Sequence, residues 1–179
     1  MRRPIVPNPI VLDVGCGANP MGDVNVDLFI GHTEHRAEPL IPEEIPNFIC
    51  CDARKLPFRD NSFDIVFSKD TLEHVGRKPQ KTNPGPYKAL KEMIRVAFRK
   101  IEVFVPHRFS MANAEKRFWR REHNAFFNLK WFESVIPKIE KELSIRLSIL
   151  VDLRRKPWLW YFLLMPDEIH IIFLKREEG

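Results

Sequence analysis

The sequence predicts an α/β protein with a mostly parallel sheet. Ile10–Val14 and Val24–Leu28 are short runs of mainly aliphatic residues, the composition of strands that are buried in a parallel sheet. Gly15 and Gly17 come directly after the first run, and two residues without a Cβ let the chain turn sharply there. Over residues 86–100, apolar side chains recur at helical spacing. Strands that alternate with such a helix are typical of an α/β fold.

The connection between the first two strands is too short for a helix of three turns. It must fit between Gly17 and Asp27, and Pro20 and Gly22 favour a tight path. The first crossover helix is therefore predicted to be shortened or absent. Asn19 stands where a third glycine is common, and asparagine is one of the few other residues that tolerate a positive φ.

Residues 29–46 predict a loop with at most a short helix, because prolines lie among polar residues. His32 and His35 fall in this loop. Their spacing is poor for a metal, so we interpret them as solvated loop histidines.

The third predicted strand is Phe48–Cys51. Its adjacent thiols, Cys50 and Cys51, make neither a disulfide framework nor a zinc pattern with the third cysteine of the chain. Because the run around them is apolar, we expect both thiols to be buried. The sequence predicts no metal site.

Polar residues follow the next two predicted strands. The fourth strand, Phe63–Phe67, leads to Asp70, and a helical turn that carries His74 comes next. The fifth strand, Ile101–Pro106, places His107 just beyond its carboxyl end. Ligands of open α/β sheets bind outside such strand ends, so these three side chains are candidates for acid or base chemistry. The alternatives are a structural role at the helix start for His74 and an exposed loop position for His107.

The last third of the chain begins with an insertion, residues 108–128, that is rich in basic and aromatic residues. A helix is predicted over Leu129–Leu143, kinked or begun again near Pro137. The last two strands are Ser144–Leu153 and Glu168–Lys175, and a tryptophan-rich run joins them.

Several motifs of the first half occur in one order. They are Ile10–Pro20 (IVLDVGCGANP), the strand-end Asp27, Cys51–Phe58 (CDARKLPF), Asn61–Phe67 (NSFDIVF) and Leu72–Val75 (LEHV). Together they closely resemble the class I S-adenosylmethionine-dependent methyltransferases, specifically the type 11 subgroup. The strong match covers roughly residues 10–75, and the rest agrees in its order of elements. The resemblance implies a compact Rossmann-like methyltransferase fold whose mostly parallel sheet ends in a terminal antiparallel strand.

The resemblance also implies roles for single residues. Asp27 would accept hydrogen bonds from the cofactor's ribose hydroxyls, and Asp52 one from the adenine amino group, although a turn residue is the simpler interpretation of Asp52. With the first helix short or absent, N–H groups of the 15–19 loop would bind the carboxylate of S-adenosyl-L-methionine. The predicted cofactor-binding residues are Asp13, Gly15, Cys16, Gly17, Asn19, Asp27, Leu28, Asp52, Ala53 and Ser68. The catalytic candidates are Asp70, His74 and His107, with His123 from the insertion.

Composition places these motifs in a single methyltransferase domain, residues 1–179, with residues 10–75 as its cofactor half. The chain is 44% hydrophobic, which is enough for a core. No apolar run reaches the length of about 18 residues that a membrane span needs. The N-terminus leaves no room for a signal peptide. Thiols that form no disulfide framework indicate a reducing compartment, so we expect a cytoplasmic protein.

Charge is distributed unevenly. Residues 1–76 carry 7 lysines and arginines against 12 acids, a net charge of −5, whereas residues 77–130 carry 14 against 4, a net charge of +10. Basic and aromatic residues of the insertion are suited to hold phosphates and stack on bases. Alternatively, the aromatic side chains pack on the sheet while the arginines face solvent.

Three functional hypotheses follow. The first is methyl transfer to an anionic acceptor such as RNA, which the charge favours slightly. The second is transfer to a small-molecule or lipid-like acceptor. The third is a non-catalytic S-adenosylmethionine-binding module that requires a partner. The apolar run 158–165 is interpreted either as a loop that covers the core or as an exposed apolar patch. As a patch it would serve a homodimer, a partner protein or contact with the acceptor.

Overall fold

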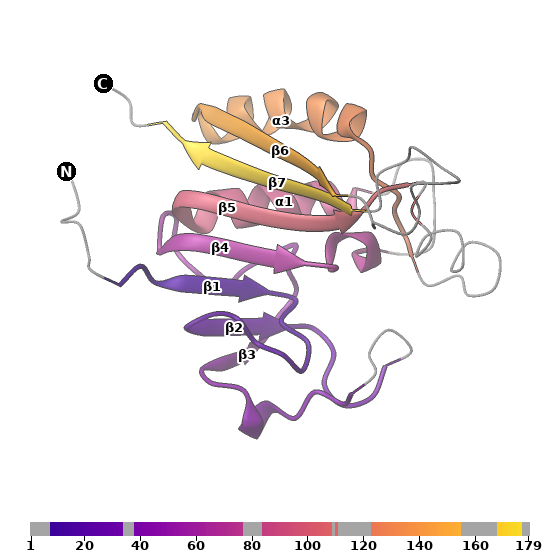
Figure 1. The fold of residues 1–179 in the computed structure, drawn as a ribbon. Coiled ribbons are helices and arrows are strands. Elements are labelled where there is room, and N and C mark those ends of the chain that lie inside the picture. The colour runs from indigo at the N-terminus through magenta and orange to yellow at the C-terminus, as the bar shows by residue number, and fades with distance from the viewer. Residues whose placement is uncertain are drawn as a thin grey trace.

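The fold is a seven-stranded sheet with helices packed on one face (Figure 1). The computed structural model describes residues 8–33, 38–76, 84–108, 110, 123–154 and 168–176. The strand order is β3-β2-β1-β4-β5-β7-β6. The strands are β1 (Val11–Val14), β2 (Val24–Asp27), β3 (Phe48–Cys50), β4 (Phe63–Lys69), β5 (Ala97–Pro106), β6 (Leu147–Arg154) and β7 (Glu168–Lys175).

The sheet is mixed in the way the resemblance implies. Neighbouring strands from β3 to β5 pair in parallel. Strand β7 pairs antiparallel with both β5 and β6. The mostly parallel sheet with antiparallel strands at one edge confirms the predicted fold class.

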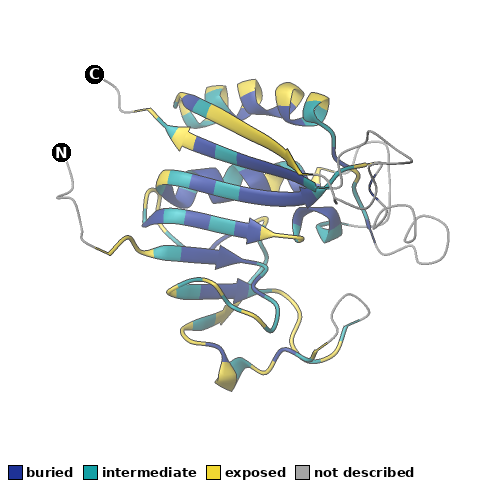
Figure 2. Ribbon diagram, viewed as in Figure 1, coloured by how far each residue is buried: buried dark blue, intermediate teal, exposed yellow. Residues whose placement is uncertain are grey.

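Two α-helices cover one face of the sheet in the described part of the chain. These are α1 (Gly85–Val96) and α3 (Leu129–Leu143), and both bury an apolar stripe against the strands. Phe132 of α3, for example, packs on Phe173 of β7 with ring centroids 6.4 Å apart. Figure 2 shows the resulting core as the buried residues of the central strands.

The residues between β1 and β2 form a tight loop without a helix, as predicted. Asp13 of β1 accepts a hydrogen bond from the backbone N–H of Met21 (2.9 Å). The side-chain oxygen of Asn25 accepts another from the N–H of Gly22 (3.0 Å). A Cβ on Gly22 would lie 2.6 Å from the carbonyl oxygen of Val24, so only glycine fits at this point.

The predicted end of one helix needs correction, and one of the two alternatives for Pro137 is excluded. Helix α1 ends at Val96 because Ala97 already pairs with Phe63 of β4, so pairing with the sheet overrides the helical spacing of the sequence. Helix α3 does not begin again at Pro137 but runs through it as one element. The short 3₁₀ helices η1 (Pro42–Glu44) and η2 (Leu72–His74) agree with the predicted loop and helical turn.

The expected burial of both adjacent thiols is wrong. Cys50 is exposed and Cys51 is partly buried. The reason is that β3 is the edge strand of the sheet, so its side chains have strand neighbours on one side only. An apolar sequence run does not reveal whether a strand is central or at the edge.

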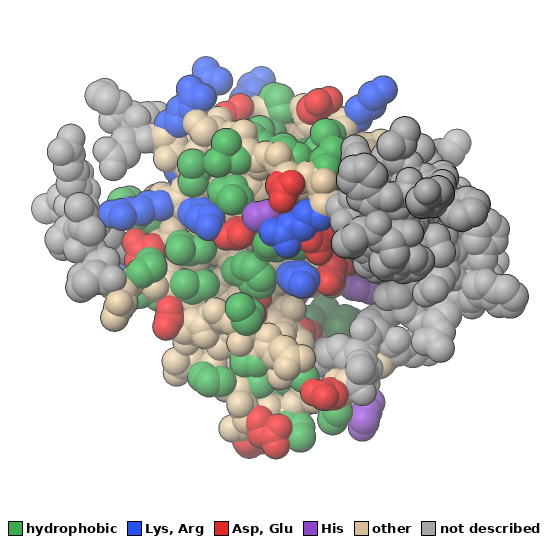
Figure 3. Space-filling model, in the orientation of Figure 1, with side chains coloured by type: hydrophobic (Ala, Val, Ile, Leu, Met, Phe, Trp, Pro, Cys, Tyr) green, Lys and Arg blue, Asp and Glu red, His purple; other side chains and the backbone are tan. Residues whose placement is uncertain are grey.

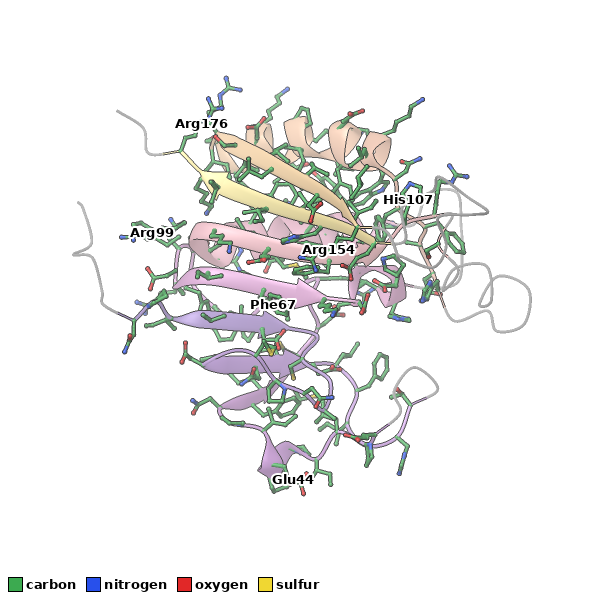
Figure 4. All side chains as sticks on the ribbon, viewed as in Figure 1. Glu44, Phe67, Arg99, His107, Arg154 and Arg176 are labelled. Carbon is green, nitrogen blue, oxygen red and sulfur yellow. The ribbon has the colours of Figure 1, made fainter. Side chains whose placement is uncertain are left out.

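The opposite face of the sheet carries no helix among the described residues. Phe104 and His170 stack on this face with ring centroids 4.0 Å apart, and the guanidinium of Arg154 lies 5.0 Å from the centroid of Phe104. Glu102 Oε1 lies 2.8 Å from His170 Nε2. Figure 3 looks onto this mixed polar and apolar surface, and Figure 4 labels Phe67 and Arg154 on it.

Two predicted segments fall mainly or wholly outside the described residues. These are most of the basic aromatic insertion, residues 109 and 111–122, and the apolar run 158–165. At the end of the insertion Phe127 is fully buried, as the packing interpretation expects, whereas Phe126 is exposed. No helix in the described part of the chain is long and apolar enough to cross a membrane.

Candidate functional site

A cavity of about 360 Å³ lies at the carboxyl ends of the parallel strands. Sequence order along the sheet reverses between β1 and β4, and ligands of open α/β sheets bind at such a switch point. The cavity is lined by Val14, Gly15, Gly17, Val26, Asp27, Leu28, Phe29, Thr33, Cys51, Asp52, Ala53, Arg54, Asp70, Thr71, His74, Val75, Gly76 and Asn124.

Gly15 and Thr71 join the two strands at the switch point. Gly15 has a φ of +78°, and a Cβ built on it would overlap the side chain of Thr71, whose own Cβ would be only 2.8 Å away. The Thr71 hydroxyl donates to the carbonyl oxygen of Lys69 (3.0 Å) and also lies within reach of that of Val14 (3.3 Å). Position 15 therefore requires glycine for both backbone conformation and space.

The glycine-loop amides are engaged within the protein. The N–H groups of Gly15 and Cys16 both donate to the carbonyl oxygen of Val26, at 2.8 and 3.1 Å. Gly17 N–H donates to Asp27 Oδ2 (3.1 Å). In this conformation these three amides of the 15–19 loop therefore donate to acceptors within the protein.

Asp27 stands at the end of β2 with its carboxylate at the cavity. Its Oδ2 accepts the hydrogen bond from the N–H of Gly17, and its Oδ1 accepts another from the N–H of Phe29 (3.0 Å). Two backbone donors hold the carboxylate in one orientation, and a carboxylate retains lone pairs for two vicinal hydroxyls. Leu28 and Phe29, both exposed, continue the cavity wall beside it.

Asp52 follows β3 and also lines the cavity, next to Ala53. Arg54 donates from Nε to both carboxylate oxygens, at 3.0 and 2.9 Å, and from its backbone N–H to Oδ1 (2.8 Å). The side-chain hydrogen bonds from Arg54 hold the pKa of Asp52 below its usual value. Asp52 is therefore an ionised acceptor at neutral pH.

Four residues predicted to bind the cofactor do not line the cavity. Cys16 is buried in a small cluster with Leu40 and Ile45, and Ser68 is buried where its hydroxyl donates to the carbonyl oxygen of Val14 (2.9 Å). Asn19 is exposed and is not among the described residues with a positive φ. Asp13 is buried beneath the β1–β2 loop.

Burial raises the pKa of Asp13 from 3.8 to about 6, although the N–H of Met21 partly offsets this effect. Because the folded-state pKa lies above the unfolded one, the native state binds this proton more tightly. The free energy of unfolding should therefore fall as the pH rises from about 4 to 6.

We predict that Asp13→Asn is more stable than the parent at pH 7, by about 1 to 3 kcal/mol, and gains nothing near pH 4. The amide oxygen can still accept from Met21, while the buried charge is gone. Urea unfolding at both pH values measures the difference. Asp23→Asn is the matched control, because Asp23 accepts from the N–H of Val11 (2.8 Å) at an exposed site. An equal gain at pH 4 and pH 7 would contradict the assignment.

Two of the four catalytic candidates line the cavity, and His107 and His123 do not. Asp70 follows β4 in a left-handed conformation (φ +50°), and both Asp70 and His74 line the cavity. His107 lies at the end of β5, bridged to Phe127, and is not among the lining residues. Burial, and secondarily Arg108, lowers the pKa of His107, so its neutral form is favoured. Figure 4 labels His107 at this end of the sheet.

Sequence reasoning missed some cavity residues, of which Thr71 and Asn124 are the clearest. The Asn124 side chain donates to the carbonyl oxygens of His74 (2.8 Å) and Gly76 (3.0 Å), across 50 and 48 positions of the chain. A local sequence pattern cannot predict a contact between residues so far apart in the chain. For Thr71 the available signal was Gly15, because a glycine can mark a point where another segment approaches the backbone closely.

A family model described as a methyltransferase domain matches residues 12–99. The chain is 33% identical over 94 residues to "Probable tRNA methyltransferase 9B" of Mus musculus, covering 50% of this chain and 20% of that protein. It is also 33% identical over 85 residues to phosphoethanolamine N-methyltransferase 3 of Arabidopsis thaliana, covering 41% and 17%. The chain thus spans a fifth or less of the length of these relatives.

Solved structures show the same fold. A SAM-dependent methyltransferase of Thermotoga maritima has a TM-score of 0.57 at 15% identity, covering 96% of this chain and 84% of that one. A protein of Haloferax volcanii, solved in complex with the methyltransferase activator Trm112, has a TM-score of 0.59 at 11% identity, covering 94% and 83%. A plantazolicin methyltransferase with bound SAH has a TM-score of 0.59 at 16% identity, covering 94% and 78%.

Proposed function

This chain belongs to the class I S-adenosylmethionine-dependent methyltransferases, and we propose that it transfers the methyl group to an anionic acceptor, RNA being the preferred class. The observation that carries the acceptor proposal is the net charge of +10 over residues 77–130, beside a cofactor half with a net charge of −5. If this segment forms a basic surface next to the acidic cofactor site, that surface would attract a polyanion to the methyl donor.

The acids at the cavity support the donor side of this proposal. Asp27, Asp52 and Asp70 line it, with Arg54 paired to Asp52. The sulfonium of S-adenosylmethionine carries a positive charge, so carboxylates nearby favour the cofactor over its neutral product. Position and orientation of donor and acceptor then account for most of the catalysis, because the sulfonium itself supplies the reactive methyl group.

The acceptor proposal also agrees with the match to a tRNA methyltransferase over half of the chain. The basic insertion would contact phosphates. Residues 77–130 contain 14 bases against 4 acids, and two of those bases, Lys91 and Arg95, also pair with acids outside the segment, Glu142 and Asp60. The proposed role of Asp70 or His74 is to receive a proton where the acceptor arrives protonated.

We predict that RNA binding weakens log-linearly with salt concentration. Replacing Lys116, Arg117, Arg120 and Arg121 with alanine should flatten the slope by up to about 3, since each lost phosphate contact lowers it by about 0.7. Filter binding over a salt series measures both slopes.

The matched control is Lys138→Ala with Lys141→Ala, two exposed lysines of α3 in a segment without net charge. The control should bind as the parent does. No measurable RNA affinity of the parent at low salt would contradict the RNA proposal.

A small anionic acceptor is the second candidate, and the phosphoethanolamine N-methyltransferase match favours it. The tryptophan-rich run 158–165 would then form an apolar wall for the acceptor. Radiolabelled methyl transfer to separate pools of RNA, protein and metabolites discriminates the two candidates. Label in the metabolite pool alone selects the small acceptor.

A module that needs a partner is the third candidate. The similarity to a protein that is complexed with an activator favours it, as does the sheet face without a helix among the described residues. For this candidate the isolated chain binds S-adenosylmethionine but labels none of the three pools.

A further inference from the structure

We propose that Glu73, His74 and His123 form a binding site for a first-row divalent cation at the edge of the cofactor cavity. Glu73 and His74 belong to η2, and His123 comes from the chain just before α3. The proposal rests on the proposed function only for the use of the ion in methyl transfer. Binding of the ion is testable without any acceptor.

The three side chains converge. One donor atom from each residue lies within 4.8 Å of the other two. The two imidazole rings meet edge to face, with centroids 4.8 Å apart and planes at 82°. Zinc with nitrogen and oxygen ligands at about 2.0–2.2 Å needs donor separations of about 3.3 Å, so a modest side-chain rotation closes the site.

Hydrogen bonds fix the backbone that presents these donors. The N–H groups of Asn124 and Ala125 both donate to the carbonyl oxygen of Glu73, at 2.6 and 3.1 Å. The side chain of Asn124 adds its two bonds to His74 and Gly76. Three hydrogen bonds thus tie the segment that carries His123 to η2, and a fourth ties it to Gly76 just beyond, so the fold itself brings the two segments together.

The donor set has the chemistry of a catalytic metal site. Two imidazoles and one carboxylate leave at least one coordination position open, whereas purely structural zinc sites are closed by four protein ligands. Glu73 is only 1% exposed and His123 only 5%. A cation would compensate the cost of burying the carboxylate.

The proposed cation site lies where a bound ion could contact the methyl acceptor. His74 and Asn124 line the cofactor cavity, so a bound cation would lie beside the methyl donor. Its open position takes an oxygen of the acceptor, a hydroxyl or a phosphate. A Lewis acid there would orient that oxygen and lower the pKa of a hydroxyl. Because His74 would then be a ligand of the ion, Asp70 would be the group that receives the proton.

Cobalt(II) titration of the tag-free, metal-stripped chain tests the site. We expect one equivalent to bind with visible d–d absorption and to raise the unfolding temperature. His123→Ala and Glu73→Gln should each weaken cobalt binding by at least about tenfold. Each variant's unfolding curve without metal establishes that it is folded, and His123→Asn replaces His123→Ala if that variant unfolds.

His170→Asn is the matched control, because His170 also contacts a glutamate, Glu102, but on the open sheet face. It should bind cobalt as the parent does. Absence of stoichiometric binding, equal affinity in His123→Ala, or a thiolate-to-cobalt charge-transfer band that assigns the metal to the cysteines would each overturn the proposal. Calorimetric binding of S-adenosylhomocysteine separates the two proposals: cofactor binding without cobalt binding overturns only the metal site.

Discussion

Gly15→Val should abolish cofactor binding, lowering the affinity for S-adenosylhomocysteine by more than about a hundredfold. Two physical effects act together. A β-branched residue is strained at a φ of +78°, by about 1–3 kcal/mol, and the new Cβ overlaps the Thr71 side chain at the cavity wall. Thr71 must move, which disrupts the contact of its hydroxyl with the carbonyl oxygen of Val14 between the ends of β1 and β4. Isothermal titration calorimetry measures the loss.

Gly31→Val separates strain from overlap. Gly31 has nearly the same φ, +77°, but a Cβ there meets nothing within 4 Å. In this control the backbone strain should lower the free energy of unfolding, while cofactor affinity should stay within a few-fold of that of the parent. If Gly15→Val binds normally, or if both variants lose binding equally, the Gly15–Thr71 contact does not shape the site.

Asp27→Ala should lower cofactor affinity by about 10- to 150-fold, equivalent to about 1.5–3 kcal/mol for hydrogen bonds to a charged acceptor. The carboxylate lines the cavity and is aligned by the N–H groups of Gly17 and Phe29. Titration with S-adenosylhomocysteine tests the ribose-binding role without any need for an acceptor.

Two further variants sharpen the result. Asp27→Asn keeps an oxygen for one of the backbone donors but loses the charge, so an intermediate affinity is expected. Asp23→Ala removes an exposed carboxylate that also accepts a backbone N–H but does not line the cavity. It should bind the cofactor as the parent does, and unchanged affinity in Asp27→Ala would refute the ribose assignment.

Only some of the cofactor-binding residues predicted from the sequence line the cavity. Strand ends are local signals, so Asp27, Asp52 and Asp70 could be placed at one edge of the sheet before the structure was known. Asp13, Cys16 and Ser68 lie beside the same strand ends but point elsewhere. Alternation along a strand separates its two faces, yet it does not say which neighbour covers each face.

The sequence by itself determined the strands, the glycine turn and the absence of a helix between β1 and β2. These depend on residue spacing and on the few residues between Gly17 and Asp27. Only the tertiary structure decided that Cys50 is at an exposed edge and that Asn124 ties His123 to η2. The physical reason is that burial and side-chain convergence arise from packing between segments about 50 positions apart, which a local pattern does not encode.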